Sequence, residues 1–154
     1  MSEPQGRPKI LIADDNIQNV ELLEVYLEEL DCDIITAYDG EETLRAIQEQ
    51  KPDLVLLDIM MPRISGFEIC RQIKENPQTR ALPILMVTAL NEAGDVERAV
   101  QAGADDFISK PIQKEDLLQR VRALLKVKDK ADDLERTLEY ITQLEERPEE
   151  ETAS

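Results

Sequence analysis

The sequence predicts an α/β protein built on a doubly wound parallel sheet of five strands. Three observations lead to this prediction. Five short apolar runs recur along the chain, turn-forming residues follow each run, and a segment with helical spacing comes next. Strict alternation of strand and helix favours parallel strands with helices on both faces of the sheet. Since crossovers between parallel strands are right-handed, the sheet is expected to be doubly wound.

The predicted strands are short and rich in Ile, Leu and Val. They are KILIA at 9–13, DIITA at 33–37, DLVLL at 53–57, PILMV at 83–87 and ADDFI at 104–108. Runs of this kind are typical of strands that are buried on both faces.

Each strand is followed by a predicted helix with an apolar stripe. The helices are expected at 17–30, 41–49, 66–75, 92–102 and from 115 onward. Their apolar residues recur every three or four positions, which places them on one face of a helix. Each of these helices therefore has one face to pack against the sheet.

Charge and composition exclude several classes of protein. The chain has 34 acidic and 18 basic residues, a net charge of −16, which disfavours contact with nucleic acid or an anionic membrane. No apolar run approaches the ~18 residues of a membrane span, and the first residues, MSEPQGRPK, lack an apolar signal core. We therefore expect a cytoplasmic protein, in which Cys32 and Cys70 are free thiols. The absence of histidine excludes His-based zinc sites and Ser-His-Asp triads.

The last 30 or so residues differ from the rest of the chain. Apolar residues there step by three and four positions, at Leu124, Val127, Ala131, Leu134, Leu138 and Ile141. This heptad seam predicts that the last helix continues to about residue 146 and pairs two chains as a coiled coil. The alternative is an amphipathic helix packed on its own domain, or a frayed one. We thus divide the chain into a domain at 8–126, a helical extension at 127–146 and a disordered acidic tail at 147–154.

Polar residues follow four of the five predicted strands. Asp14 and Asp15 follow the first, Asp58 the third, Thr88 the fourth and Lys110 the fifth. The carboxyl ends of parallel strands meet at one edge of a sheet, so these side chains are expected to converge. Three carboxylates repel one another unless a cation such as Mg²⁺ is bound. With a lysine and a threonine opposite, such a site suits a phosphoryl group, and Asp58 is the best candidate nucleophile.

Each of these residues also has a simpler interpretation. Asp14 and Asp15 could cap the helix at 17–30. Lys110 could be a solvated loop residue, and Thr88 alone indicates nothing. Asp58 is different, because an acid placed after four buried aliphatic residues is costly unless it is paired or liganded. The functional interpretation rests on the combination.

Four motifs occur in order along the chain: LIADDN, LVLLDIMMPRISG, MVTA and GADDFISKP. In these motifs, residues 8–126 resemble the receiver domain of bacterial two-component response regulators. The resemblance implies a flavodoxin-like fold with strand order 2-1-3-4-5. It also implies that Asp58 accepts a phosphoryl group from a histidine kinase or histidine phosphotransfer protein in a Mg²⁺-dependent reaction.

The resemblance assigns a role to each residue of the motifs. Asp15 would bind Mg²⁺ directly, Asp14 directly or through water, and the backbone carbonyl of Met60 would be a further ligand. Thr88 and Lys110 would contact the phosphoryl oxygens, and the bond from Lys110 to Pro111 would be cis.

The resemblance also implies a conformational switch on phosphorylation and a lifetime for the acyl phosphate. Thr88 and Phe107 would move together on phosphorylation and change the face formed by the fourth helix, the fifth strand and the fifth helix. Met60 and Leu90 occupy the two positions that control access of water to the acyl phosphate in this family. Because both are bulky and apolar, we expect intrinsic dephosphorylation to be slow.

The output is left open by the sequence. Asp106 and Arg120 match one ion pair that links subunits in a class of DNA-binding regulators, while Val96 departs from another. We expect a regulator that signals to a downstream protein effector by contact. The alternative is the receiver part of a longer regulator whose effector, such as a cyclase, phosphodiesterase or kinase, is missing, with 126–146 as the signalling helix.

Two enzyme-like alternatives fit poorly. Phosphatases with an aspartate nucleophile need an acid two residues beyond it, where this chain has Met60. A flavodoxin-type electron carrier needs a Ser/Thr-rich loop after the first strand, where Asp14 and Asp15 would repel a phosphate. We therefore expect no turnover of an external substrate.

Overall fold

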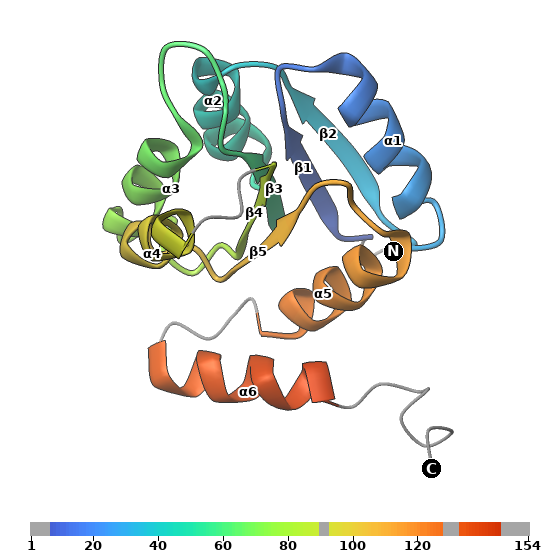
Figure 1. Cartoon of the computed structure of the whole chain (residues 1–154), viewed down its shortest axis with the longest axis vertical. Coiled ribbons are helices and arrows are strands. Elements are labelled where there is room, and N and C mark those ends of the chain that lie inside the picture. The colour runs from blue at the N-terminus through green and yellow to red at the C-terminus, as the bar shows by residue number, and fades with distance from the viewer. Residues whose placement is uncertain (1–6, 90–92, 128–132, 146–154) are drawn as a thin grey trace.

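The computed structural model describes residues 7–89, 93–127 and 133–145. Its sheet contains five parallel strands in the order β2-β1-β3-β4-β5 (Figure 1). The strands are β1 Lys9–Ala13, β2 Asp33–Ala37, β3 Leu54–Asp58, β4 Ile84–Thr88 and β5 Asp106–Ser109. The parallel sheet and its strand order are confirmed.

Helices cover both faces of the sheet. They are α1 Ile17–Leu27, α2 Gly40–Gln50, α3 Gly66–Glu75, α4 Ala93–Ala102 and α5 Lys114–Lys126. One hydrophobic cluster joins the sheet to α1 and α5, and a second joins it to α2, α3 and α4. In Figure 1 the two groups of helices lie on opposite sides of the strands, as in a doubly wound fold.

The central strands are apolar because both of their faces are covered. Ile10 and Ile12 of β1 belong to the cluster under α1 and α5, while Leu11 and Ala13 belong to the other cluster. All residues of β3 and β4 are buried, including the polar residues at their ends. The burial of Asp58 is thus a consequence of its place in the middle of the sheet.

Both cysteines are free and buried. Burial raises the pKa of the Cys70 thiol to about 12, so the reactive thiolate is scarce at neutral pH. Among the described residues, no helix is both long enough and apolar enough to cross a membrane.

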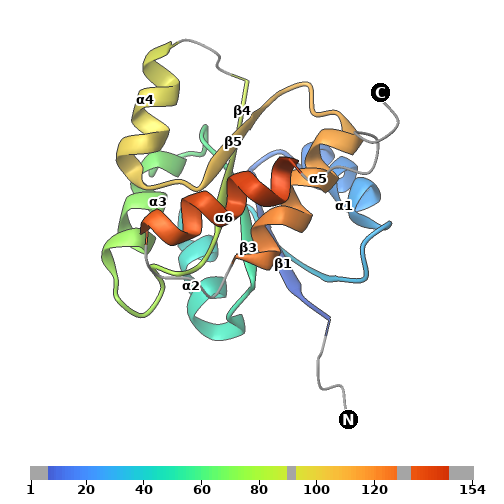
Figure 2. The same ribbon diagram turned by 90° about the horizontal axis from the view of Figure 1, so that it is seen from below.

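The prediction of one continuous last helix is wrong. Helix α5 ends at Lys126, and a separate helix, α6 Asp133–Glu145, lies beside it (Figure 2). The physical reason is that Leu124 and Val127 are fully buried in the domain's own core, whereas Leu138 and Ile141 are exposed. These residues therefore do not form one seam. The side chains of Ala131 and Leu134 and the tail at 147–154 lie outside the described residues.

A candidate metal and phosphoryl site

Three carboxylates converge at the carboxyl edge of the sheet. One ligand oxygen each from Asp14, Asp15 and Asp58 lie within 4.8 Å of one another. Asp14 and Asp15 follow the end of β1, and Asp58 is the last residue of the adjacent β3, where Ala13 pairs with Leu57. Asp14 and Asp58 are buried, while Asp15 is exposed. The convergence expected from the sequence is therefore present.

The carboxylates do not cap the helix that follows them. The cap of α1 is Asn16, whose side chain accepts hydrogen bonds from the backbone N–H groups of Gln18 and Asn19. Asp14 instead accepts a bond from the N–H of Asn16, 2.9 Å from its Oδ1. Asn16 was not predicted as the cap, although asparagine is a preferred cap residue.

One oxygen of Asp14 is left without a hydrogen bond. Its Oδ2 is buried and has no hydrogen-bond partner in the described parts of the chain. The nearest cation is the Lys110 ammonium, whose Nζ lies 3.7 Å away. A buried oxygen in this state is costly unless a ligand or ion completes its contacts, and the lone pair is available to a metal ion.

Lys110 points into the acidic cluster rather than into solvent. Its Nζ lies 3.4 Å from Asp58 Oδ1, and its backbone N–H donates to the Thr88 carbonyl at 2.7 Å. The peptide bond between Lys110 and Pro111 is cis, as expected. The interpretation of Lys110 as a solvated loop residue is therefore wrong.

The charges of the site do not balance. One ammonium group faces three carboxyl groups. Burial, reinforced by the negative charge of Asp14, raises the pKa of Asp58 to about 6, and Lys110 only partly opposes this rise. A hard divalent cation would remove the excess negative charge, so this donor set fits Mg²⁺.

Thr88 and Phe107 lie on the neighbouring strands. Thr88 ends β4 one position beyond Val87, which pairs with Asp58, and it is buried. Phe107 of β5 pairs with Met86 and is partly buried against the cluster under α2, α3 and α4. Met60 follows β3 and is 62% exposed. Leu90 lies outside the described residues.

Gly66 allows the loop after Asp58 to fold back over the end of β3. Its N–H donates to the Ile59 carbonyl at 2.9 Å. A Cβ at this position would lie 2.8 Å from the Ile59 Cα and would collide with the Asp58 carbonyl oxygen. This role of Gly66 was not predicted, although a glycine directly after the cap residue Ser65 was the available signal.

A family model for the response regulator receiver domain matches residues 10–122. The chain belongs to the response regulator receiver family. Receiver domains work with histidine kinases in two-component systems and are typically signalling modules rather than enzymes. The acidic triad is typical of the Mg²⁺-binding site of such receivers.

The receiver is similar to parts of longer proteins. It is 42% identical to the alkaline phosphatase synthesis transcriptional regulatory protein PhoP of Bacillus subtilis over 77% of this chain and 48% of that protein. It is 41% identical to the response regulator PleD of Caulobacter vibrioides over 82% of this chain and 28% of that protein. The chain thus spans half or less of the length of these curated relatives.

The receiver is also similar to solved structures. The beryllofluoride-activated receiver domain of DrrB from Thermotoga maritima is 34% identical, with a TM-score of 0.70 over 78% of this chain and 98% of that one.

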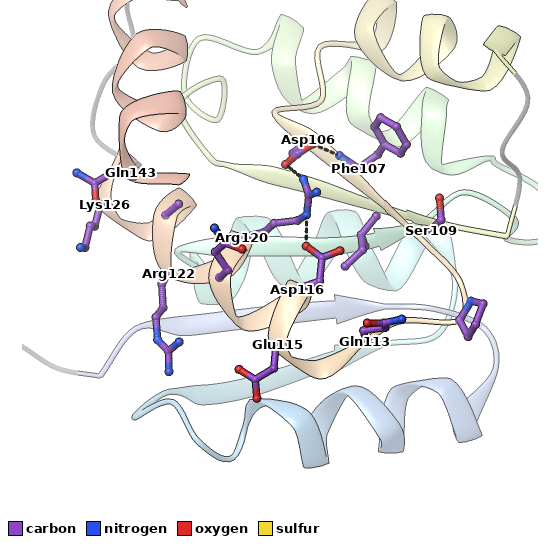
Figure 3. A pocket seen from close by; sticks show the side chains of 14 residues that line it. Asp106, Phe107, Ser109, Gln113, Glu115, Asp116, Arg120, Arg122, Lys126 and Gln143 are labelled. Atoms are coloured by element: carbon purple, nitrogen blue, oxygen red, sulfur yellow. Dashed lines mark hydrogen bonds and ion pairs between the residues drawn. The ribbon is translucent and has the colours of Figure 1, made fainter. Parts of the chain in front are cut away.

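An open groove of about 1110 Å³ lies away from the acidic site, over β5 and α5 (Figure 3). Within it, Arg120 forms an ion pair with Asp106 and a second one with Asp116, 2.7 Å from Nε to Oδ1. Asp106 and Arg120, which match an ion pair between subunits, therefore pair within this receiver.

Proposed function

We propose that this receiver accepts a phosphoryl group on Asp58 from a histidine kinase or a histidine phosphotransfer protein, and then signals to a protein partner. The observation that carries the proposal is the unbalanced cluster of Asp14, Asp15 and Asp58 around one ammonium group. In the transfer, an Asp58 oxygen forms the new bond to phosphorus while the bond from phosphorus to the donor nitrogen breaks. The imidazole leaves and no electrons are exchanged with a redox partner.

The metal site would comprise the three carboxylates and the backbone carbonyl of Met60. Bound Mg²⁺ would neutralise charge on the phosphoryl oxygens. Asp14 contributes Oδ2, which has no hydrogen bond in the described parts of the chain, so metal binding there would break no hydrogen bond of the protein. The exposure of Asp15 leaves room for metal-bound water.

Lys110 and Thr88 would orient the phosphoryl group. The Lys110 ammonium needs to move little, because it already lies 3.4 Å from Asp58. Thr88 would donate its hydroxyl hydrogen to a phosphoryl oxygen, and Phe107 would turn inward as Thr88 moves. The result is a population shift in the face formed by α4, β5 and α5.

The acyl phosphate should be long-lived. The Met60 side chain is apolar and cannot orient a water molecule for attack, and Leu90 shares that character. We expect a lifetime of hours rather than seconds in Mg²⁺ buffer without a phosphatase. Loss of the phosphoryl group within seconds would contradict this part of the proposal.

The central test is phosphorylation by acetyl phosphate with Mg²⁺, followed by the intact mass of the protein. Wild type should gain one phosphoryl group, Asp58→Asn should gain none, and EDTA should abolish the gain in wild type. Asp53→Asn is the matched control, since Asp53 lies beside the other end of β3 and accepts a bond from the Lys9 N–H. Equal phosphorylation of wild type and Asp58→Asn would overturn the assignment.

The output is proposed to be contact with a downstream protein effector in the cytoplasm. The net charge of −16 disfavours nucleic acid and anionic membranes as direct partners. Pairing of two chains through the C-terminal helix stays a prediction, for which Leu138 and Ile141 remain exposed.

A second candidate is the receiver part of a longer regulator with an effector such as a cyclase, phosphodiesterase or kinase. The observation that favours it is that the matched relatives are at least about twice as long as the aligned part. The mass of the native protein, isolated from its source, distinguishes the two: about 17.5 kDa supports a stand-alone receiver. A larger mass supports the longer regulator.

A further inference from the structure

Helix α6 covers part of the receiver beside the groove over β5 and α5. It runs antiparallel to α5, and both views place the two helices side by side (Figures 1 and 2). At one end the Gln119 side chain donates to the Leu144 carbonyl at 2.9 Å. Toward the other end, the Tyr140 ring packs in the same apolar cluster as Leu124 and Val127.

Asp106 is the point where α6 is attached to the sheet. Its Oδ1 accepts the Phe107 N–H at 2.8 Å, and its Oδ2 accepts bonds from the Arg120 guanidinium and the Tyr140 hydroxyl. One carboxylate therefore holds β5, α5 and α6 together.

Tyr140 is well suited to act as a latch, meaning that its hydroxyl holds α6 against the receiver through a hydrogen bond to Asp106. It is 8% exposed, and a buried hydroxyl needs a hydrogen-bond partner. Asp106 supplies that partner, so a Tyr140 hydroxyl separated from Asp106 would either remain buried and unbonded or move into water. The attachment of α6 thus depends on where Asp106 lies.

The same short strand reaches the phosphoryl site. Asp106 is the first residue of β5, and Lys110 directly follows its last residue, Ser109. Strand β5 is at the edge of the sheet, and among the described strands it pairs with β4 alone. The two ends of a four-residue strand are therefore bound to α6 and to the Asp58 cluster.

We propose that α6 is a displaceable cover, latched by Tyr140 to Asp106, and that occupation of the Asp58 site loosens it. This inference rests on the proposed function. The direction follows from the contacts: Asp106 belongs to β5 and bonds Arg120 of α5 and Tyr140 of α6, so a shift of β5 that accompanies the turning of Phe107 strains at least one of these two bonds. Loosening α6 would uncover the apolar surface around Leu124 and Val127.

The experiment measures hydrogen–deuterium exchange of the full chain, with and without Mg²⁺ and beryllofluoride. Beryllofluoride is the probe for site occupation, and slower exchange in the segment after Asp58 reports its binding. The second readout is exchange of the α6 amides. Tyr140→Phe removes the bond to Asp106 and keeps the ring, while Tyr38→Phe is the control at an exposed tyrosine.

We expect Tyr140→Phe to speed α6 exchange on the order of tenfold without any ligand, since one bond to a carboxylate is lost. Tyr38→Phe should match wild type. In wild type, beryllofluoride should slow exchange after Asp58 and speed it in α6.

Two results overturn the inference and leave the proposed function standing. One is slower exchange after Asp58 with unchanged or slower exchange in α6. The other is α6 exchange in Tyr140→Phe equal to that of wild type, which would exclude the latch. If beryllofluoride and Mg²⁺ leave the segment after Asp58 unaffected, the proposed function itself fails and the inference fails with it.

Discussion

Two acids at opposite ends of the sheet, the partly buried Asp105 and the buried Asp58, are bonded very differently. At the amino end, Asp105 accepts bonds from the Lys74 ammonium at 3.0 Å and the Ile84 N–H at 2.8 Å. Lys74 also donates to the carbonyls of Arg80 and Leu82. At the carboxyl end, the ion pair that the described residues give the Asp58 carboxylate is a long one, 3.4 Å to the Lys110 ammonium.

The difference separates a structural ion pair from the ion pair of the proposed phosphoryl site. Around Lys74 and Asp105, each charge is compensated by protein groups, so the pair needs no further ligand. Around Asp58 the protein leaves negative charge in excess, which costs stability and fits the proposed binding of a cation and a phosphoryl group. The degree of hydrogen bonding, rather than burial alone, distinguishes the two acids.

The largest expected effect is at the structural pair. Asp105→Ala leaves the Lys74 charge and the Ile84 N–H without their partner, so we expect a loss of about 3 kcal/mol in the free energy of unfolding. Urea denaturation measures it. The matched control is Asp31→Ala at an exposed position, expected to change stability by about 0.5 kcal/mol or less. A similarly small loss for Asp105→Ala would mean that the pair is not structural.

The second largest expected change in stability is a gain rather than a loss. Asp58→Asn removes the charge responsible for a pKa raised from 3.8 to about 6, so the metal-free protein at pH 7.5 should gain about 2 to 3 kcal/mol of stability. Thermal or urea unfolding in EDTA measures the gain. Asp53→Asn should give no gain. A destabilised Asp58→Asn protein would contradict the view that Asp58 is strained by uncompensated charge.

The pH dependence of stability tests the charge on Asp58 independently. The pKa of Asp58 is higher in the folded protein, about 6, than its ordinary value of 3.8, so protonation favours folding. This contribution is fully present below about pH 3.8 and is lost as the pH rises through about 6. Between pH 5 and 7.5 in EDTA, the stability of wild type relative to Asp58→Asn should therefore fall. A constant difference over that range would exclude Asp58 as the titrating group.

The smallest expected change in stability is at Asn16, which caps α1 beside the acidic site. Asn16→Ala removes the side chain that accepts bonds from the N–H groups of Gln18 and Asn19, so unfolding should become easier by about 1 kcal/mol. The exposed Gln18→Ala is the control in the same chemical denaturation series. An unchanged stability would mean that neighbouring groups replace the cap.

Much of the fold could be predicted because its signals are local. The bounds of β1, β2 and α3 agree with those expected at 9–13, 33–37 and 66–75. The fifth strand was expected at 104–108 but begins at Asp106, where pairing with Leu85 of β4 starts. Asp105 precedes the strand, and its side chain bonds Lys74 and the start of β4, a role that the sequence pattern does not reveal.

The candidate site could be predicted equally well, since parallel strands bring their carboxyl ends to one edge of the sheet whatever the details of packing. The sequence pattern was therefore enough to predict the alternation of elements and the meeting of Asp14, Asp15, Asp58 and Lys110. The packing of the last apolar stripe could not be predicted in the same way. A heptad seam suits a partner chain or the chain's own core equally well, because either buries one face of a helix. The structure buries Leu124 and Val127 in the core and leaves Leu138 and Ile141 exposed, so the seam is divided between the core and the surface.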